Sequence, residues 1–321
     1  MDMTPYCDQV ISIQRERGLG HLYTFFKELQ RRRNIDLIVD MHGTLRALFL
    51  RLFFPFIPRV VVDKRTIERS LLTFFKWDLL SMQNSSTLKR DKRRGEPLLL
   101  RNILDFKLIF DLPKIELNKP LSFCTVTFSE IDWDSFKLKW QLQGVLKKEF
   151  ITVVPTASFP EKRWSKENFY QMIELSLNHQ QLRSFPILLL AGKNDEFCRE
   201  FDSLEKKYPN RFFNLQGKTS LIESAQLLKN ALVCVGNDTG LPHIAESVGT
   251  KALFILGPTG EEFGFYPHLK ESDFIGLKLW CRPCTTNGKG NCIRSERFCL
   301  TQITPNMVIN KLIKLVDGHA F

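Results

Sequence analysis

The sequence lacks a hydrophobic run long enough to cross a membrane. Its longest apolar stretch extends from Ala47 to Pro58 and is interrupted by Arg51, whereas a spanning helix needs about 20 apolar residues. The opening segment, MDMTPYCDQVISIQRERG, also lacks the apolar core of a secretory signal. We therefore expect a cytoplasmic protein without a transmembrane helix.

Two binding signatures are missing as well. No G-x-G-x-x-G follows any predicted strand, which sets aside an NAD-linked dehydrogenase. The basic residues are not interleaved with an RNP-like or zinc-finger pattern, which argues against a nucleic-acid partner.

The composition, 43% hydrophobic and 25% charged, excludes a disordered chain. At roughly 100–200 residues per domain, the 321 residues predict two domains.

Acidic residues are in deficit. The chain has 46 Lys and Arg against 35 Asp and Glu, a formal net charge of +11. This balance favours an acidic partner such as a phosphorylated substrate or an anionic membrane surface, without choosing between them. Basic clusters and many of the 27 Phe share the first third of the chain. Such a surface suits an anionic bilayer, although a solvated basic face is the simpler alternative.

The second half alternates short apolar runs with helical patterns. The apolar runs, typical of buried parallel strands, cover 151–155, 186–192, 231–236 and 251–257. The helical patterns between them cover 166–180, 194–208 and 220–230. This alternation predicts a doubly wound α/β domain.

The first half repeats the same rhythm more weakly. Strands are predicted over 8–13, 35–43 and 59–64, helices over 20–33 and 45–53, a polar loop over 80–97 and a helix over 98–111. We place the domain boundary at 148/149. The expected domains are therefore 1–148 and 149–321.

The segment GNDTGLPHIAES (236–247) predicts an anion site. A strand ends at Gly236, a polar turn follows, and Pro242 lies in the first turn of the next helix, where its missing N–H costs nothing. The helix start offers free N–H groups and the positive end of the dipole. Thr239 and His243 add side-chain donors. The segment is suited to a diphosphate, although it also fits an ordinary strand-to-helix turn.

Two further loops follow predicted strands. In TASFPEKRW (156–164), Ser158 offers a hydroxyl and Lys162 is suited to neutralise a leaving diphosphate; the alternative is a basic loop anchored by Trp164. In GKNDE, Asp195 or Glu196 is suited to accept from a ribose hydroxyl or to cap a helix. Because carboxyl ends of parallel strands meet at one edge, the three loops together predict a nucleotide site.

These segments resemble a known family. VGNDTGLPHIAESVGTKALFILGPT, PTASFPEKRW and QGKTSLIESAQLL are similar to the carboxy-terminal domain of family 9 glycosyltransferases, which include the ADP-heptose:lipopolysaccharide heptosyltransferases. RRRNIDLIVDMHGTLRALFLRL resembles the family's amino-terminal acceptor domain. The resemblance implies a GT-B fold, in which two Rossmann-like domains face a cleft. It also implies inverting transfer from ADP-heptose to an inner-core lipopolysaccharide sugar, at the cytoplasmic face of the inner membrane.

The resemblance also assigns residues. On the donor side it implies Ser158, Lys162, Asp238, Thr239, Gly240, Leu241, His243 and, more loosely, Glu196. On the acceptor side it implies His42, Gly43 and Arg46, to which we add the basic pair Lys64 and Arg65. It implies no metal for catalysis, because Lys162 and the helix dipole would replace one. The expected acceptor is an acidic glycolipid.

One expected element is missing from this sequence. The family's proposed catalytic base is an Asp in a Gly-rich loop after the first strand, and the sequence contains no such opening. The general base therefore stays unnamed, and we expect that the natural opening is lacking. Two alternatives follow: a truncated, non-catalytic nucleotide-sugar-binding relative, or a glycosyltransferase of the same fold that uses another nucleotide sugar.

The cysteines fall into two groups. Cys281, Cys284, Cys292 and Cys299 are clustered, with a spacing that suggests structural zinc or an iron–sulfur centre. Free thiols or a partial disulfide are the alternative. The other four, Cys7, Cys124, Cys198 and Cys234, are scattered in apolar contexts. Of these, Cys198 and Cys234 are expected to be small core residues.

Overall fold

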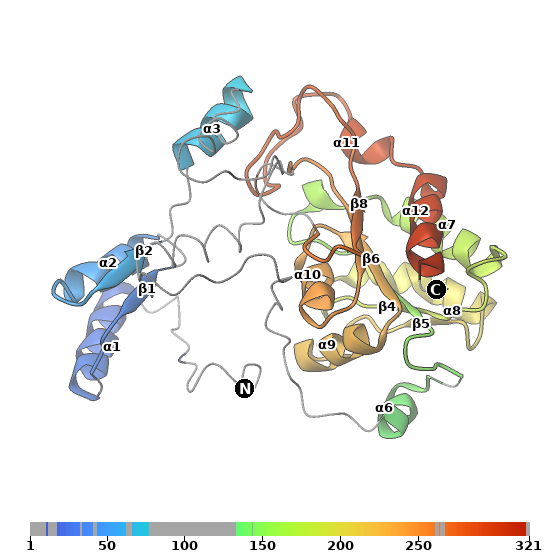
Figure 1. Ribbon diagram of the computed structural model, residues 1–321, viewed down its shortest axis with the longest axis horizontal. Helices are drawn as coiled ribbons and strands as arrows, with labels where there is room; N and C mark the ends of the chain where they lie inside the picture. The colour runs from blue at the N-terminus through green and yellow to red at the C-terminus, as the bar shows by residue number, and fades with distance from the viewer. Residues whose placement is uncertain are drawn as a thin grey trace.

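A computed structural model describes most of the second half of the chain and part of the first (Figure 1). The described residues are 11, 18–32, 34–40, 44–61, 66–76, 133–142, 144–260, 263 and 267–318. The elements predicted over 8–13 and 80–111 therefore lie outside the described residues, apart from residue 11. Within the described part, no helix is both long and apolar enough to cross a membrane.

The second half forms a six-stranded parallel sheet. Its strands are β3 (Ile151–Val154), β4 (Ile187–Leu189), β5 (Phe212–Asn214), β6 (Val233–Asn237), β7 (Ala252–Ile255) and β8 (Asp273–Ile275). They are ordered β5-β4-β3-β6-β7-β8. The chain builds outward from β3 to β5 and then returns to place β6 beside β3. The carboxyl ends of β3 and β6, called here the switch-point edge, are where open α/β sheets bind their ligands.

All strands of this sheet except β8 are buried along their whole length, which explains the continuous apolar runs. Every residue of β3, β4 and β7 is buried. β3 and β6 pair with Val154 opposite Gly236. A Cβ added at Gly236 would lie 2.8 Å from the Val154 carbonyl oxygen and 3.0 Å from Pro242 Cγ. Glycine therefore permits the close approach of β6, β3 and the following helix.

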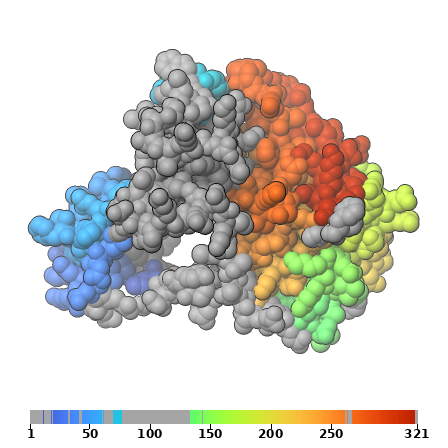
Figure 2. All heavy atoms as spheres, viewed as in Figure 1, coloured from blue at the N-terminus to red at the C-terminus, as the bar shows by residue number. Residues whose placement is uncertain are grey.

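Helices cover both faces of this sheet. One face packs against α7 (Lys166–Asn178), α8 (Asp202–Lys207) and α12 (Pro305–Asp317). The other packs against α6 (Trp133–Trp140), α9 (Leu221–Asn230) and α10 (Gly240–Ser247). The result is a three-layer α/β/α unit. Figure 2 shows the orange and red atoms of its last third as one continuous surface.

The predicted boundary lies close to this unit. α6 precedes residue 148, yet its Phe136 belongs to the core beneath α9 and α10, together with Leu142, Val145 and Phe150. The segment from 133 onward thus packs with the second sheet. The division at 148/149 stays a prediction.

The first half contributes a smaller βαβ unit. It contains α1 (Gly18–Arg32), β1 (Ile38–Asp40), α2 (Leu45–Phe53) and β2 (Arg59–Val61). β1 and β2 are parallel neighbours. Their core is aromatic: Leu22, Phe26, Ile38 and Phe54 are buried, and further Phe side chains pack around them.

A helix outside this βαβ unit contacts the second unit. α3 (Thr66–Phe75) places Leu72 against buried Phe263. Beyond its last residue, Lys76 Nζ donates to the carbonyl oxygens of Cys281 at 2.9 Å and Pro283 at 2.7 Å. The cysteine-bearing segment is thereby joined to the first half of the chain.

Most predicted elements are confirmed, with some corrections. The strands at 151–155, 186–192, 231–236 and 251–257 and the helix at 45–53 are present. The helix predicted over 194–208 is instead a 3-10 helix, η4 (Glu196–Phe201), followed by α8. Among the elements of the described residues, seven were not predicted: α3, α6, η3 (Pro160–Lys162), β5, β8, α11 (Phe298–Thr301) and α12.

Candidate active site

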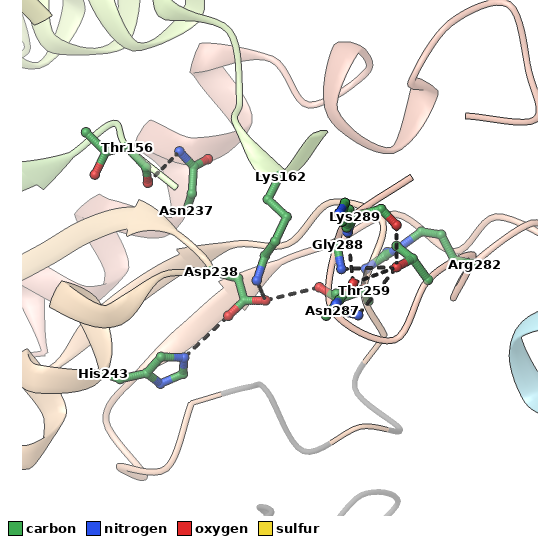
Figure 3. A network of polar contacts seen from close by, with 11 residues as sticks. Thr156, Lys162, Asn237, Asp238, His243, Thr259, Arg282, Asn287, Gly288 and Lys289 are labelled. Carbon is green, nitrogen blue, oxygen red and sulfur yellow. Dashed lines mark hydrogen bonds and ion pairs between the residues drawn. The ribbon is translucent and has the colours of Figure 1, made fainter. Parts of the chain in front are cut away.

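Two predicted charged residues meet at the switch-point edge (Figure 3). Lys162 ends the short 3-10 helix η3 (Pro160–Lys162) after β3, and Asp238 directly follows β6. Lys162 Nζ forms an ion pair with Asp238 Oδ2, and the two side chains are only 13% and 4% exposed. The sheet topology therefore assembles a largely buried ion pair from residues 76 positions apart.

The Asp238 carboxylate has two further partners. Thr259 Oγ1 donates to Oδ2 at 3.1 Å, and His243 Nε2 lies 3.4 Å from Oδ1. Burial alone would raise the pKa of Asp238, but the hydrogen bond with His243 and the positive charge of Lys162 outweigh it and lower the pKa. Asp238 is therefore a charged acceptor at neutral pH.

Asn237 joins the loops that carry these groups. Its Nδ2 donates to the carbonyl oxygen of Pro155 at 2.9 Å, and its Oδ1 accepts from the Trp164 N–H at 2.9 Å. Trp164 is 1% exposed, and its ring N–H donates to Ile303. The loop after β3 is thus anchored by Trp164, as its simpler interpretation predicted, and also presents Lys162 to Asp238.

The start of α10 is open for an anion. Its N-cap residue, Thr239, forms no side-chain capping bond. An added Cβ at the exposed Gly240 would meet no atom within 4 Å. The Thr239 side chain therefore leaves the first N–H groups of α10 uncapped, and α10 begins two residues after Asp238, the ion-pair partner of Lys162.

A second loop packs on Lys162. Gly288 has φ of +92°, and a Cβ there would lie 2.2 Å from Lys162 Cδ. Thr285 Oγ1 accepts from the Gly288 N–H at 3.2 Å, which helps to fix the turn. The loop between Cys284 and Cys292 therefore packs against the aliphatic part of the Lys162 side chain (Figure 3).

The other predicted donor residues differ in position. Ser158 and Glu196 are exposed, and Leu241 is half-buried at the start of α10. Asp195 does not cap η4 through its side chain; instead its Oδ2 accepts from the Gly192 N–H at 2.9 Å. The capping interpretation is therefore wrong for Asp195.

Most of the predicted acceptor side is not described. His42, Gly43, Lys64 and Arg65 lie outside the described residues. Arg46 is described and lies exposed on α2. The acceptor assignments stay predictions.

Sequence analysis missed two residues of this network, Thr259 and Arg282. Thr259 is 1% exposed, and its carbonyl oxygen accepts from Arg282 Nη2 at 2.8 Å. A signal was present for Thr259, because it follows the predicted strand at 251–257 and so belongs to the same sheet edge. Arg282 carries no comparable signal, since it lies in an irregular segment.

The clustered cysteines are free thiols in this structure. Cys281 and Cys299 are buried, and Cys284 and Cys292 are half-buried. Burial raises the pKa of Cys299 to about 11. In the described part of the chain, the one convergent group of three potential metal ligands lies elsewhere. Cys281, Cys284 and Cys292 nevertheless lie close enough to Cys299 to interact electrostatically with its thiol. The metal assignment of these four residues stays a prediction. Cys198 and Cys234 are fully buried, as expected.

The convergent group is His243, Glu246 and His268, whose ligand atoms lie within 4.8 Å of one another. Glu246 Oε1 accepts from the backbone N–H groups of His268 at 2.8 Å and Leu269 at 3.0 Å. Burial and the neighbouring His243 lower the pKa of His268 to about 4. These bonds join α10 to the segment before β8 and account for the convergence without a metal.

Comparison with known proteins identifies the family. The model of glycosyltransferase family 9 (heptosyltransferase) matches residues 22–292. The chain belongs to glycosyltransferase family 9. It is 28% identical over 305 residues to lipooligosaccharide heptosyltransferase 2 of Haemophilus influenzae, covering 93% of this chain and 81% of that protein.

Solved structures show that this glycosyltransferase has the fold of the heptosyltransferases. An Escherichia coli ADP-heptose lipopolysaccharide heptosyltransferase II matches with a TM-score of 0.65 at 20% identity, over 94% of this chain and 82% of that one. An E. coli heptosyltransferase solved with ADP-2-deoxy-2-fluoro heptose matches with a TM-score of 0.55 at 18% identity, over 92% and 76%. The predicted α/β class and GT-B fold are confirmed.

Proposed function

We propose that this glycosyltransferase transfers heptose from ADP-heptose to an inner-core lipopolysaccharide acceptor, with inversion. The observation that carries the proposal is the buried Lys162–Asp238 pair beside the open start of α10. An ammonium group and free helix N–H groups at one point are suited to a diphosphate. Family membership supports the choice of a heptose donor.

The reaction is a displacement at the anomeric carbon. The acceptor hydroxyl oxygen forms a bond to that carbon, and its proton passes to a general base. The bond from the carbon to the diphosphate oxygen breaks, and its electron pair stays on the diphosphate. Lys162 and the first turn of α10 stabilise this growing negative charge. We propose that no metal is needed, because these groups supply the positive charge.

The acceptor side supports contact with an anionic membrane. α2 carries Leu45 and Leu52, which are 85% and 67% exposed, and Phe56 beyond its end is 97% exposed. Arg46 of α2 and Arg59 of β2 are also exposed. A small unit that exposes both apolar and basic side chains suits an anionic lipid–water interface. We propose a peripheral position at the cytoplasmic face of the inner membrane, close to an acidic glycolipid acceptor.

Two measurements test the function. The purified chain is incubated with ADP-heptose and heptose-free lipopolysaccharide, with and without EDTA, and the glycolipid is analysed by mass spectrometry. We expect the acceptor to gain one heptose under both conditions. A titration then compares ADP with UDP and GDP. Selective ADP binding without transfer would favour the non-catalytic alternative, and preference for UDP or GDP would favour another donor.

The membrane proposal has its own test. We expect the chain to float with vesicles containing phosphatidylglycerol and not with vesicles of phosphatidylcholine alone. Leu52→Glu should weaken this binding, because it places a negative charge on the apolar surface of α2. Leu221→Glu, at an exposed leucine of the second unit, is the control. Equal binding to both vesicle types would contradict the proposed electrostatic contribution.

A further inference from the structure

Thr259 presents its hydroxyl to the Asp238 carboxylate from the loop after β7. It follows β7, is 1% exposed, and donates from Oγ1 to Asp238 Oδ2 at 3.1 Å. That same oxygen carries the ion pair with Lys162. Asp238 Oδ2 is therefore shared by a charged donor and a neutral one, as Figure 3 shows.

The two donors differ in freedom. The Lys162 ammonium group lies at the end of a long side chain with several rotatable bonds. The Thr259 hydroxyl is attached directly to Cβ of a short side chain that is buried. The Thr259 backbone is also fixed: its carbonyl oxygen accepts from Arg282 Nη2 at 2.8 Å, and Arg282 Nη1 donates to the carbonyl oxygen of Leu277. One donor can thus move, and the other is held in place.

This difference matters once a diphosphate arrives. The diphosphate of the proposed sugar donor, ADP-heptose, competes with the Asp238 carboxylate for the Lys162 ammonium group. This competition is strongest when the leaving diphosphate gains negative charge. If the Lys162 ammonium group shifts toward the diphosphate, the Asp238 carboxylate loses part of its ion pair. Water cannot replace that partner well, because the Asp238 side chain is only 4% exposed to solvent. A buried charge that loses a partner is costly unless another hydrogen bond remains.

We infer that Thr259 is a positioning residue for Lys162: its hydroxyl keeps the Asp238 carboxylate hydrogen-bonded and so releases Lys162 to the diphosphate. This inference rests on the proposed function. It acts through Asp238 and requires no contact between Thr259 and substrate.

Thr259→Val tests the inference, because valine keeps the shape of threonine and removes the hydroxyl. Without this bond, Asp238 depends more on Lys162 and retains its ammonium group. We expect ADP affinity of the purified chain to fall about tenfold, the typical consequence of losing a hydrogen bond to a buried charged group. Thr259→Ser keeps the hydroxyl and should restore most of the affinity.

A double-mutant cycle separates positioning from general destabilisation. ADP binding is measured by calorimetry for the wild type, Thr259→Val, Lys162→Met and the double variant. If Thr259 acts through Lys162, its substitution should change affinity by less than twofold once Lys162 is methionine. Thr250→Val is the matched control, since Thr250 is 2% exposed and its hydroxyl donates to the Leu228 carbonyl oxygen.

Each other result overturns the inference. Equal losses from Thr259→Val in both backgrounds would show additivity and therefore no action through Lys162. A Thr259→Ser variant as weak as Thr259→Val, or an equal loss in Thr250→Val, would point to packing instead. If the wild type bound no ADP, the proposed function itself would fail first, and the inference with it.

Discussion

The two parallel sheets of this chain differ in how completely their covering helices are buried. α7 on the second sheet buries Phe169, Met172, Ile173 and Leu177. α2, beside the first sheet, has no fully buried side chain along its length. The polar network of Lys162, Asp238 and Thr259 also belongs to the second unit, whose helices are the better buried ones. The polar network of the second unit is therefore supported by a buried core, whereas α2 exposes apolar side chains.

The largest effect should come from the buried helix. Phe169→Ala removes a ring that is 0% exposed and should lower the free energy of unfolding by about 3–5 kcal/mol. Leu52→Ala on α2, where the side chain is 67% exposed, should change it by less than about 0.5 kcal/mol. Urea unfolding of both variants measures the difference. A similar loss of unfolding free energy in Leu52→Ala would show that Leu52 is buried in solution. The difference in burial between α7 and α2 would then not hold.

The next effect concerns the buried pair of the second unit. Lys162→Met should reduce heptose transfer by about 10²–10³-fold, because it removes a charge that stabilises the leaving diphosphate. Lys166→Met is the matched control four residues away, since Lys166 is exposed and pairs with Glu200 at 2.6 Å. Initial rates at saturating ADP-heptose are the measurement. Equal transfer rates in the two variants would show that Lys162 does not contribute to catalysis.

Much of this site could be predicted because its parts are local in sequence. β3 and β6 are buried on both faces, so they appear as continuous apolar runs. Asp238 follows β6 directly, and Lys162 lies in the loop after β3. The topology then brings the two together. β5 and β8 were missed because each holds only two consecutive apolar residues, Phe212–Phe213 and Phe274–Ile275, next to polar ones. The equally short β4 lies in a longer apolar run. The Thr259–Asp238 bond joins the loops after β6 and β7, 21 residues apart in the sequence. The predicted strand at 251–257 places Thr259 at this edge, but only the structure shows which side chains touch.

A smaller effect tests the loop that covers Lys162. Gly288→Ala should lower transfer by about tenfold, because its φ of +92° disfavours a side chain and the added methyl group would displace Lys162. Gly290→Ala is a close control: φ there is +131°, but a Cβ meets no atom within 4 Å. Both variants bear backbone strain, and only one touches Lys162. Equal losses of transfer would attribute the effect to strain alone.

The smallest effect is the pH dependence contributed by Asp238. Its pKa is lowered in the folded chain, because the hydrogen bond with His243 and the charge of Lys162 outweigh burial. The ionised carboxylate therefore contributes stability above the pKa of the unfolded chain, about 4, and this contribution is lost as pH falls through the folded pKa. The difference in unfolding free energy between wild type and Asp238→Asn should be largest near pH 7 and shrink below pH 4. Urea titrations across that range measure it; a constant difference would mean that the second unit does not depend on the charge of Asp238.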